Sequence, residues 1–204
     1  MYNKNQFFGD FIRAYGYLGP ANFRFGQLAD SAARYIDMCF QVYNNAATNS
    51  LQALLVGRIV KKNGAGERIN ISQIGYGLDD VERQNFGRTN VESVGAVLDT
   101  DSWSVAMNDS WLMGGIHAQL DIYLASPRTA ANIVDPQFGA TVTGRELLGL
   151  ATFGYTLHPN TQQGEVFVCT DASRARSASF VAYERAFNEA KKCGGFAALV
   201  NATA

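Results

Sequence analysis

The chain has 204 residues, of which 47% are hydrophobic and 12% aromatic, and its formal net charge is −1. This composition predicts a single globular domain over residues 1–204 with a substantial core, and it favours a packed globule over a disordered chain. Charged residues make up only 17% of the chain. A nearly neutral chain without runs of like charge has nothing to attract nucleic acid or an anionic membrane, so we expect neither as a partner.

The cysteines and the N-terminal segment bear on the compartment. Cys39, Cys169 and Cys193 are too few and too widely spaced for a disulfide framework, so free thiols are expected. The first residues lack the uninterrupted apolar run of a signal peptide or a membrane span. We therefore expect a cytoplasmic protein, or one that is exported without a cleaved signal peptide.

The N-terminal half of the chain predicts helices followed by strands. Apolar residues at three- and four-residue steps predict two helices, and short apolar runs between turn signals predict three strands. Asn63-Gly64 is typical of a hairpin turn between the first two of these strands. The expected helices are 2–15 and 27–44, and the expected strands are 51–60, 67–76 and 91–98.

The stretch 103–124 has the clearest alternation in the chain. Apolar and polar residues alternate over 116–124, and this period of two predicts a strand with one buried face. A shorter strand is expected at 103–107, with N-D-S as the turn between the two. Because the connections are short, these strands are expected to form an antiparallel meander.

The C-terminal part predicts helices around one further strand. A helical turn is expected at 129–134, a strand at 165–169 and a long helix at 172–192, capped by Thr170 or Asp171 and ended by Gly194. Thr143 and Glu146 have the spacing of a capping box for a helix that runs to Phe153. The long helix is expected to pack Phe180, Val181 and Phe187 on the sheet. The predicted fold is α+β, with an antiparallel sheet of about five or six strands packed by an N-terminal and a long C-terminal helix.

The polar face of the central strand is the first candidate site. His117, Gln119, Asp121 and Tyr123 would share that face if 116–124 is a strand. Adjacent members of the row would lie roughly 6.6 Å apart, close enough to contact one ligand together. Met113-Gly114-Gly115 just before it would admit a bulge or a close backbone approach. The alternative is a sheet face that is solvated or covered by a helix.

The second candidate is Cys169, at the end of a strand and the start of the long helix, followed by Asp171. A helix N-terminus lowers a thiol pKa and favours the thiolate nucleophile. With His117 or His158 as base, Cys169 would form a cysteine–histidine acyl-transfer site, and His117 is the preferred base. The alternative is a strand-end cysteine without a chemical role.

Other chemistry has weaker signals. Arg174, Arg176 and Arg185, with Arg145 upstream, are a candidate anion site, although arginines on a helix surface are usually solvated. The chain contains no phosphate loop, nucleophile elbow, dinucleotide fingerprint or CxxC motif, so no cofactor and no metal site is expected.

Two functions remain. The favoured one is a non-catalytic binding or assembly module, because a surface with few charges and many aromatic side chains suits a protein partner or self-association. The alternative is a small Cys-His hydrolase or transferase, of the effector-toxin kind, with Cys169 as nucleophile and His117 as base. The residue pattern does not indicate a small-molecule ligand.

Overall fold

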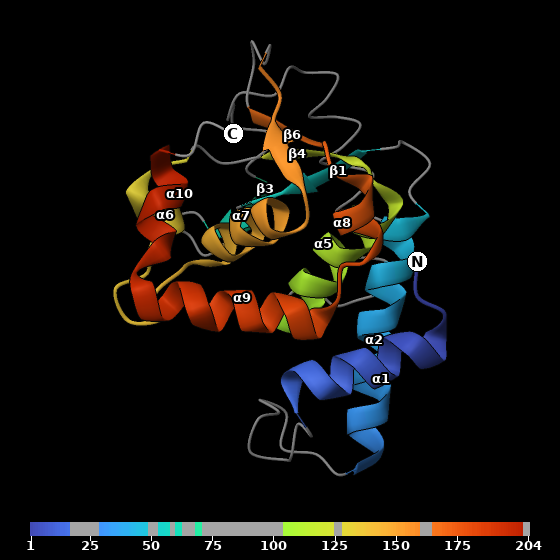
Figure 1. Cartoon of the computed structure of the whole chain (residues 1–204). Helices are drawn as coiled ribbons and strands as arrows, with labels where there is room; N and C mark the ends of the chain where they lie inside the picture. Colours follow the sequence, from blue (N-terminus) through green and yellow to red (C-terminus); the bar gives the residue numbers. More distant parts are fainter. Residues whose placement is uncertain are drawn as a thin grey trace.

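A computed structural model describes residues 1–16, 29–48, 53–57, 60–62, 68–70, 104–124, 128–159 and 165–201. In these ranges the protein is an α+β fold, as predicted. Figure 1 shows the main sheet at the top, with α5 and α7 beneath it and α9 along the lower side. None of the described helices is long and apolar enough to cross a membrane.

Two helices begin the chain, strands and helices are mixed in its middle, and helices end it. The helices are α1 (Lys4–Tyr15), α2 (Ala29–Ala47), α5 (Val105–Ala118), α6 (Ala130–Ile133), α7 (Val142–Thr152), α8 (Ala172–Arg176), α9 (Phe180–Cys193), the 3-10 turn η5 (Gly195–Ala197) and α10 (Ala198–Asn201). The strands are β1 (Ala53–Val56), β2 (Val60–Lys62), β3 (Arg68–Asn70), β4 (Asp121–Leu124), β5 (Tyr155–Leu157) and β6 (Glu165–Cys169).

The main sheet is mixed, which corrects the expectation of an antiparallel meander. Its four strands lie in the order β1-β4-β6-β5. β1 pairs with β4 in parallel, whereas the β4–β6 and β5–β6 pairs are antiparallel. A parallel pair needs a long crossover connection, and α5 lies in the segment between β1 and β4. The connection before β4 is therefore not a short turn, because the N-terminal part of the supposed central strand is a helix.

The strand predicted over 116–124 is wrong in its first part. Residues Val105–Ala118 form α5, which also replaces the strand expected at 103–107, and only Asp121–Leu124 form a strand. Gln119 ends the helix in the left-handed conformation, with φ 56°. The apparent alternation therefore joined the last helical residues to a turn and a short strand. α5 is buried on all sides, so it lacks the amphipathic period that identifies a surface helix.

Three further boundaries differ from the sequence prediction. The N-cap of α7 is Thr141, whose side chain accepts from Gly144 N–H, so the capping box at Thr143 is wrong. The long C-terminal helix is divided into α8 and α9, because Ser179 caps a second helix start by accepting from Ala182 N–H. The strand β5 was not among the expected strands.

Several predictions for the two ends of the chain are confirmed. The structure contains α1 and α2 close to 2–15 and 27–44, the turn α6 and the strand β6. Asp171 caps α8, and Gly194 ends α9 with φ 64°. The expected strand 51–60 is divided between β1 and β2, and β2 pairs with β3 antiparallel. Three expected features lie outside the described residues: the strand 91–98, residues 71–76 of the strand 67–76, and the Asn63-Gly64 turn.

The core is built around α5. This helix lies along α2 and also contacts α7 and β1. The predicted packing of the C-terminal helix on the sheet is wrong, because α9 lies against α1 and α7. Phe180 is fully buried among Phe7 and Phe11, whereas Val181 is 42% exposed. Phe187 is half-buried and packs against Phe196.

Candidate functional site

Three consecutive polar residues lie in the middle of the buried helix α5. Asn108, Asp109 and Ser110 are all buried, and Asp109 is 0% exposed. Ser110 donates from its hydroxyl to the carbonyl of Ala106, one turn back along the helix. A buried carboxylate is costly unless it is paired and hydrogen-bonded, so the surroundings of Asp109 decide what this cluster does.

Asp109 forms a two-pronged ion pair with Arg145 from α7. The Nε of Arg145 lies 2.9 Å from Oδ1, and Nη2 lies 2.7 Å from Oδ2 of Asp109. The hydroxyl of Tyr15, from α1, donates to Oδ2 at 2.5 Å. The carboxylate therefore receives both a fork of charged donors and a phenol, which is the arrangement that makes a buried charge tolerable.

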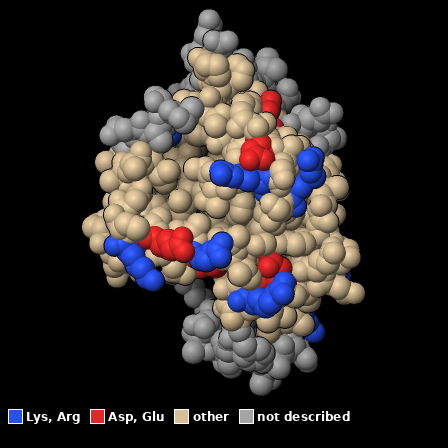
Figure 2. Space-filling model, viewed as in Figure 1, with Lys and Arg blue, Asp and Glu red and all other residues tan. Residues whose placement is uncertain are grey.

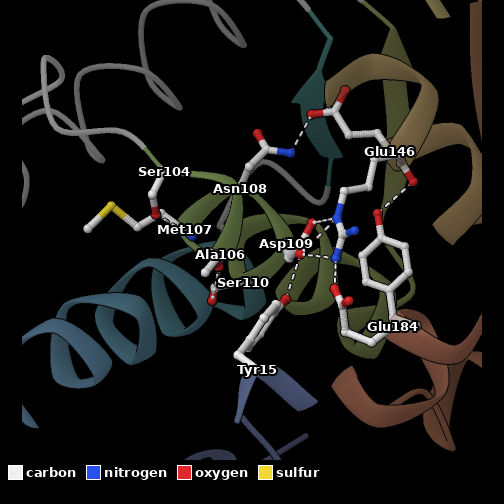
Figure 3. Close-up of polar contacts among 11 residues, drawn as sticks. Tyr15, Ser104, Ala106, Met107, Asn108, Asp109, Ser110, Glu146 and Glu184 are labelled. Atoms are coloured by element: carbon white, nitrogen blue, oxygen red, sulfur yellow. Dashed lines mark hydrogen bonds and ion pairs between the residues drawn. The ribbon is translucent and has the colours of Figure 1, made fainter. Parts of the chain in front are cut away.

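Arg145 is enclosed on its other sides. Its Nη2 also pairs with Glu184 from α9. The guanidinium lies 4.9 Å from the ring centre of Tyr183 and 4.3 Å from that of Phe187. Figure 3 shows Tyr15 and Glu184 converging on this pair from different helices. Burial lowers the pKa of Arg145, but the charge of Asp109 and its hydrogen bonds outweigh that effect and raise it. The Nε and Nη2 groups of Arg145 are thus bound by carboxylates, and the side chain is buried, so Arg145 is not part of an exposed anion site.

Glu146, the next residue of α7, has a different environment. It is 1% exposed, and its two oxygens accept from Asn108 Nδ2 at 2.9 Å and from Gly57 N–H at 2.8 Å. Both donors are neutral, and no described cation pairs with this carboxyl. Burial raises its pKa to about 7; the two hydrogen bonds oppose this rise, and the charge of Asp109 adds to it. The core thus holds two buried carboxyls: Asp109 pairs with a cation, and Glu146 pairs with none among the described residues.

His117 is a core residue of α5, where a strand position was predicted. Its Nε2 lies 3.0 Å from the carbonyl of Ala178, so Nε2 carries the proton and donates. Its Nδ1 then accepts from the hydroxyl of Tyr43 at 2.9 Å. Burial lowers the pKa of His117, although the bond to Ala178 opposes this. Both ring nitrogens are therefore engaged in joining α5 to α2 and to the segment between α8 and α9.

Cys169 lies half-buried at the end of β6, where the sequence placed it. Burial raises the pKa of its thiol, and a backbone contact with Asp171 opposes this only in part. The N–H groups of Thr170 and Asp171 both donate to the carbonyl of Gly154 at 2.8 and 3.0 Å, so they do not form a site for an oxyanion. The helix that begins here, α8, has only 5 residues.

His158 is also remote from Cys169 along the sheet. Tyr155 is the ladder partner of Cys169, and the N–H of His158 donates to the carbonyl of Val166. These positions are three residues apart on β6, or about 10 Å at the rise of a strand. The structure gives His117 other partners and gives His158 another ladder position, so no described contact joins either histidine to the thiol.

The other predicted binding residues are dispersed. Asp121 and Tyr123 do share a face of β4, where Asp121 is exposed and Tyr123 half-buried. Gln119 lies in the turn that ends α5. Asp171 uses its carboxylate to cap α8, accepting from the N–H groups of Ser173 and Arg174. A common pocket floor of these residues with His117 is not formed, because His117 lies inside the helix.

The residues that form the buried cluster were not among the sequence candidates, except Arg145. One feature of the sequence did indicate this cluster. The polar triplet N-D-S at 108–110 lies within an otherwise apolar run, whereas a turn between strands is normally exposed. Among the described residues, no group of three or more His, Cys, Asp or Glu side chains is placed to hold a metal ion. No known family model, curated protein or solved structure shows significant similarity to the chain.

Proposed function

We propose that this protein is a non-catalytic assembly module that associates with a second copy of itself through an apolar surface around Phe138. The observation that carries the proposal is the exposure of this ring. Phe138 is 58% exposed, the highest value among the described aromatic side chains. Phenylalanine is enriched in protein interfaces, where burial of the ring stabilises association.

The segment that holds Phe138 is rigid. The N–H groups of Gln137 and Phe138 each donate to Oδ1 of Asp135 at 2.8 Å, and Gly139 N–H donates to the Asp135 carbonyl at 2.7 Å. Thr141 N–H donates back to the carbonyl of Ile133. An anchor that is already ordered loses little conformational entropy on binding, so this turn favours association.

The surroundings of the turn also suit contact between copies. Val142, at the start of α7, is 42% exposed and lies four positions after Phe138. In Figure 2 the charged side chains of the viewed face gather in a few groups of mixed sign, and uncharged surface separates these groups. With a net charge of −1, two copies repel each other little, and proteins of nearly zero net charge associate readily.

The alternative, a Cys-His hydrolase or transferase, has less support. Its thiol has a raised pKa, and both ring nitrogens of its preferred base, His117, have other partners. We also propose that the protein is located in the reducing cytoplasm, or is exported without a cleaved signal. Free thiols at Cys39, Cys169 and Cys193 support this location.

Replacement of Phe138 by Ser is expected to abolish self-association without loss of stability, because the ring is mostly exposed. Sedimentation velocity over a wide range of protein concentration measures this directly. Wild-type protein is expected to sediment faster as concentration rises, and Phe138→Ser to remain monomeric. Asp135→Ala removes the acceptor of the two hydrogen bonds that order the turn, so it is also expected to weaken association.

Val181→Ser is the matched control, since Val181 is an exposed apolar residue on α9, away from the turn. It is expected to associate like wild type. A wild-type protein that remains monomeric at all concentrations, or a Phe138→Ser variant that associates as strongly as wild type, would overturn the proposal.

A further inference from the structure

The junction of Glu146 with Asn108 and Gly57 connects three elements that are distant in sequence. Glu146 belongs to α7, Asn108 to α5, and Gly57 directly follows the last residue of β1. In Figure 3, Asn108 extends toward the Glu146 carboxyl, across the gap between their two helices. We refer to these three residues as the Glu146 junction. Through the hydrogen bond from Gly57 N–H to Glu146, the junction connects α7 to the carboxyl end of β1.

We propose that the Glu146 junction is a proton-controlled joint, which is closed while the carboxyl carries a proton and loosens when the proton leaves. The geometry supports this because the carboxyl is buried and, among the described residues, accepts hydrogen bonds only from neutral donors. A buried carboxylate without a cation is strongly disfavoured, whereas a buried carboxylic acid that is hydrogen-bonded is not.

No ion pair joins the Glu146 carboxyl to a cation in the part of the chain that the structure describes. Arg145 precedes Glu146 on α7, but its guanidinium is already bound by Asp109 and Glu184. The Asp109 carboxylate adds a like charge that opposes ionisation of Glu146. Among the described residues, Asp109 on α5 and Tyr183 on α9 interact electrostatically with Glu146. The other charged and titratable groups of the adjoining ion pair are Arg145 on α7, Glu184 on α9 and Tyr15 on α1.

The direction of the pH effect follows from linkage. Burial raises the pKa of Glu146 from the ordinary 4.5 to about 7 in the folded protein. The folded state therefore holds the proton more tightly than the unfolded state does. The stability contributed by the bound proton is complete below pH 4.5, and it is lost as pH rises through about 7. Loosening of the junction thus accompanies a change from mildly acid to mildly alkaline conditions.

Glu146→Gln tests the joint, because glutamine retains the shape and an acceptor but cannot ionise. We expect the denaturant midpoint of the variant to equal or fall below that of wild type at pH 5, and to exceed it at pH 8. Burial lowers the pKa of His117, but this residue is present in both proteins and its contribution cancels in the comparison. Parallel pH profiles for the two proteins would overturn the proposal.

Glu189→Gln is the matched control, because Glu189 is an exposed carboxyl on α9. Its midpoint is expected to follow the wild-type pH profile. If Glu146→Gln does not fold, the carboxyl carbon of Glu146 in isotopically labelled wild-type protein gives the same answer by NMR. A titration midpoint near pH 7 supports the joint, and one near the ordinary 4.5 overturns it.

Native-state hydrogen exchange locates the effect. After correction for the intrinsic rate, the Gly57 amide of wild type is expected to lose protection between pH 6 and 8, and that of Glu146→Gln to retain it. Amides of the β4–β6 ladder, such as the pairing of Ile122 with Phe167, are expected to change less. Equal losses at Gly57 and in this ladder would overturn a local joint.

Discussion

Replacement of Arg145 by Met is expected to lower the free energy of unfolding by about 3–5 kcal/mol, the cost of leaving a buried charge without its partner. Asp109 is 0% exposed and depends on Arg145 for three of its hydrogen bonds. The variant also leaves Glu184 without its cation and removes the guanidinium from between Tyr183 and Phe187. Denaturant unfolding at neutral pH measures the loss.

Two variants show whether burial of the pair causes the effect. Arg174→Met removes an exposed arginine whose Nε lies 3.6 Å from Asp171, and it is expected to cost less than about 1 kcal/mol. The double variant Asp109→Leu with Arg145→Met removes both buried charges and is expected to recover a large part of the loss. If Arg145→Met were no more destabilising than Arg174→Met, the buried pair would not be a structural determinant.

Gly114→Ala is expected to destabilise the protein by about 1–3 kcal/mol, the usual cost of overpacking, even though alanine favours helix. A Cβ atom at this position of α5 would lie 2.3 Å from the carbonyl oxygen of Tyr43 and 2.7 Å from Cβ of Ala46. These atoms belong to α2, so the two helices would have to separate. The shift would also disturb the bond from Tyr43 to His117.

Gly9→Ala is the matched control on α1, where an added Cβ meets nothing within 4 Å. It is expected to raise stability by roughly 0.5–1 kcal/mol, because glycine in the middle of a helix is unfavourable. Opposite signs for the two glycines, measured by thermal or denaturant unfolding, are the expected result. A stabilising Gly114→Ala would mean that α5 and α2 are not in close backbone contact.

The sequence predicted the ends of the chain better than its middle. α1 and α2 are amphipathic, and Asp171 and Gly194 are ordinary helix boundary residues, so local rules identified them. α5 has no amphipathic period because the fold surrounds it, and Gly114 and Gly115 argue against a helix by propensity. Those glycines are required by tertiary contacts with α2 and with β1, which local rules do not contain.

The candidate site depended even more on tertiary structure. Cys169 was correctly placed at a strand end, but the partners of His117 are Tyr43 and Ala178, residues distant in sequence. The assignment of His117 to a strand face followed from the wrong period over 116–124. The ion pair of Asp109 with Arg145 crosses from α5 to α7, and spacing along the chain carries no information about such a contact.

The pH dependence of Cys169 alkylation tests most directly the proposal that Cys169 is not an activated nucleophile. A Cys193→Ser background removes the exposed thiol, and Cys39 is fully buried with its pKa raised to about 12. Because burial raises the pKa of the Cys169 thiol, its alkylation rate is expected to reach half its maximum above about pH 8.5, the value of a free thiol. A half-maximum clearly below that pH would show an activated thiolate, and it would contradict the non-catalytic account.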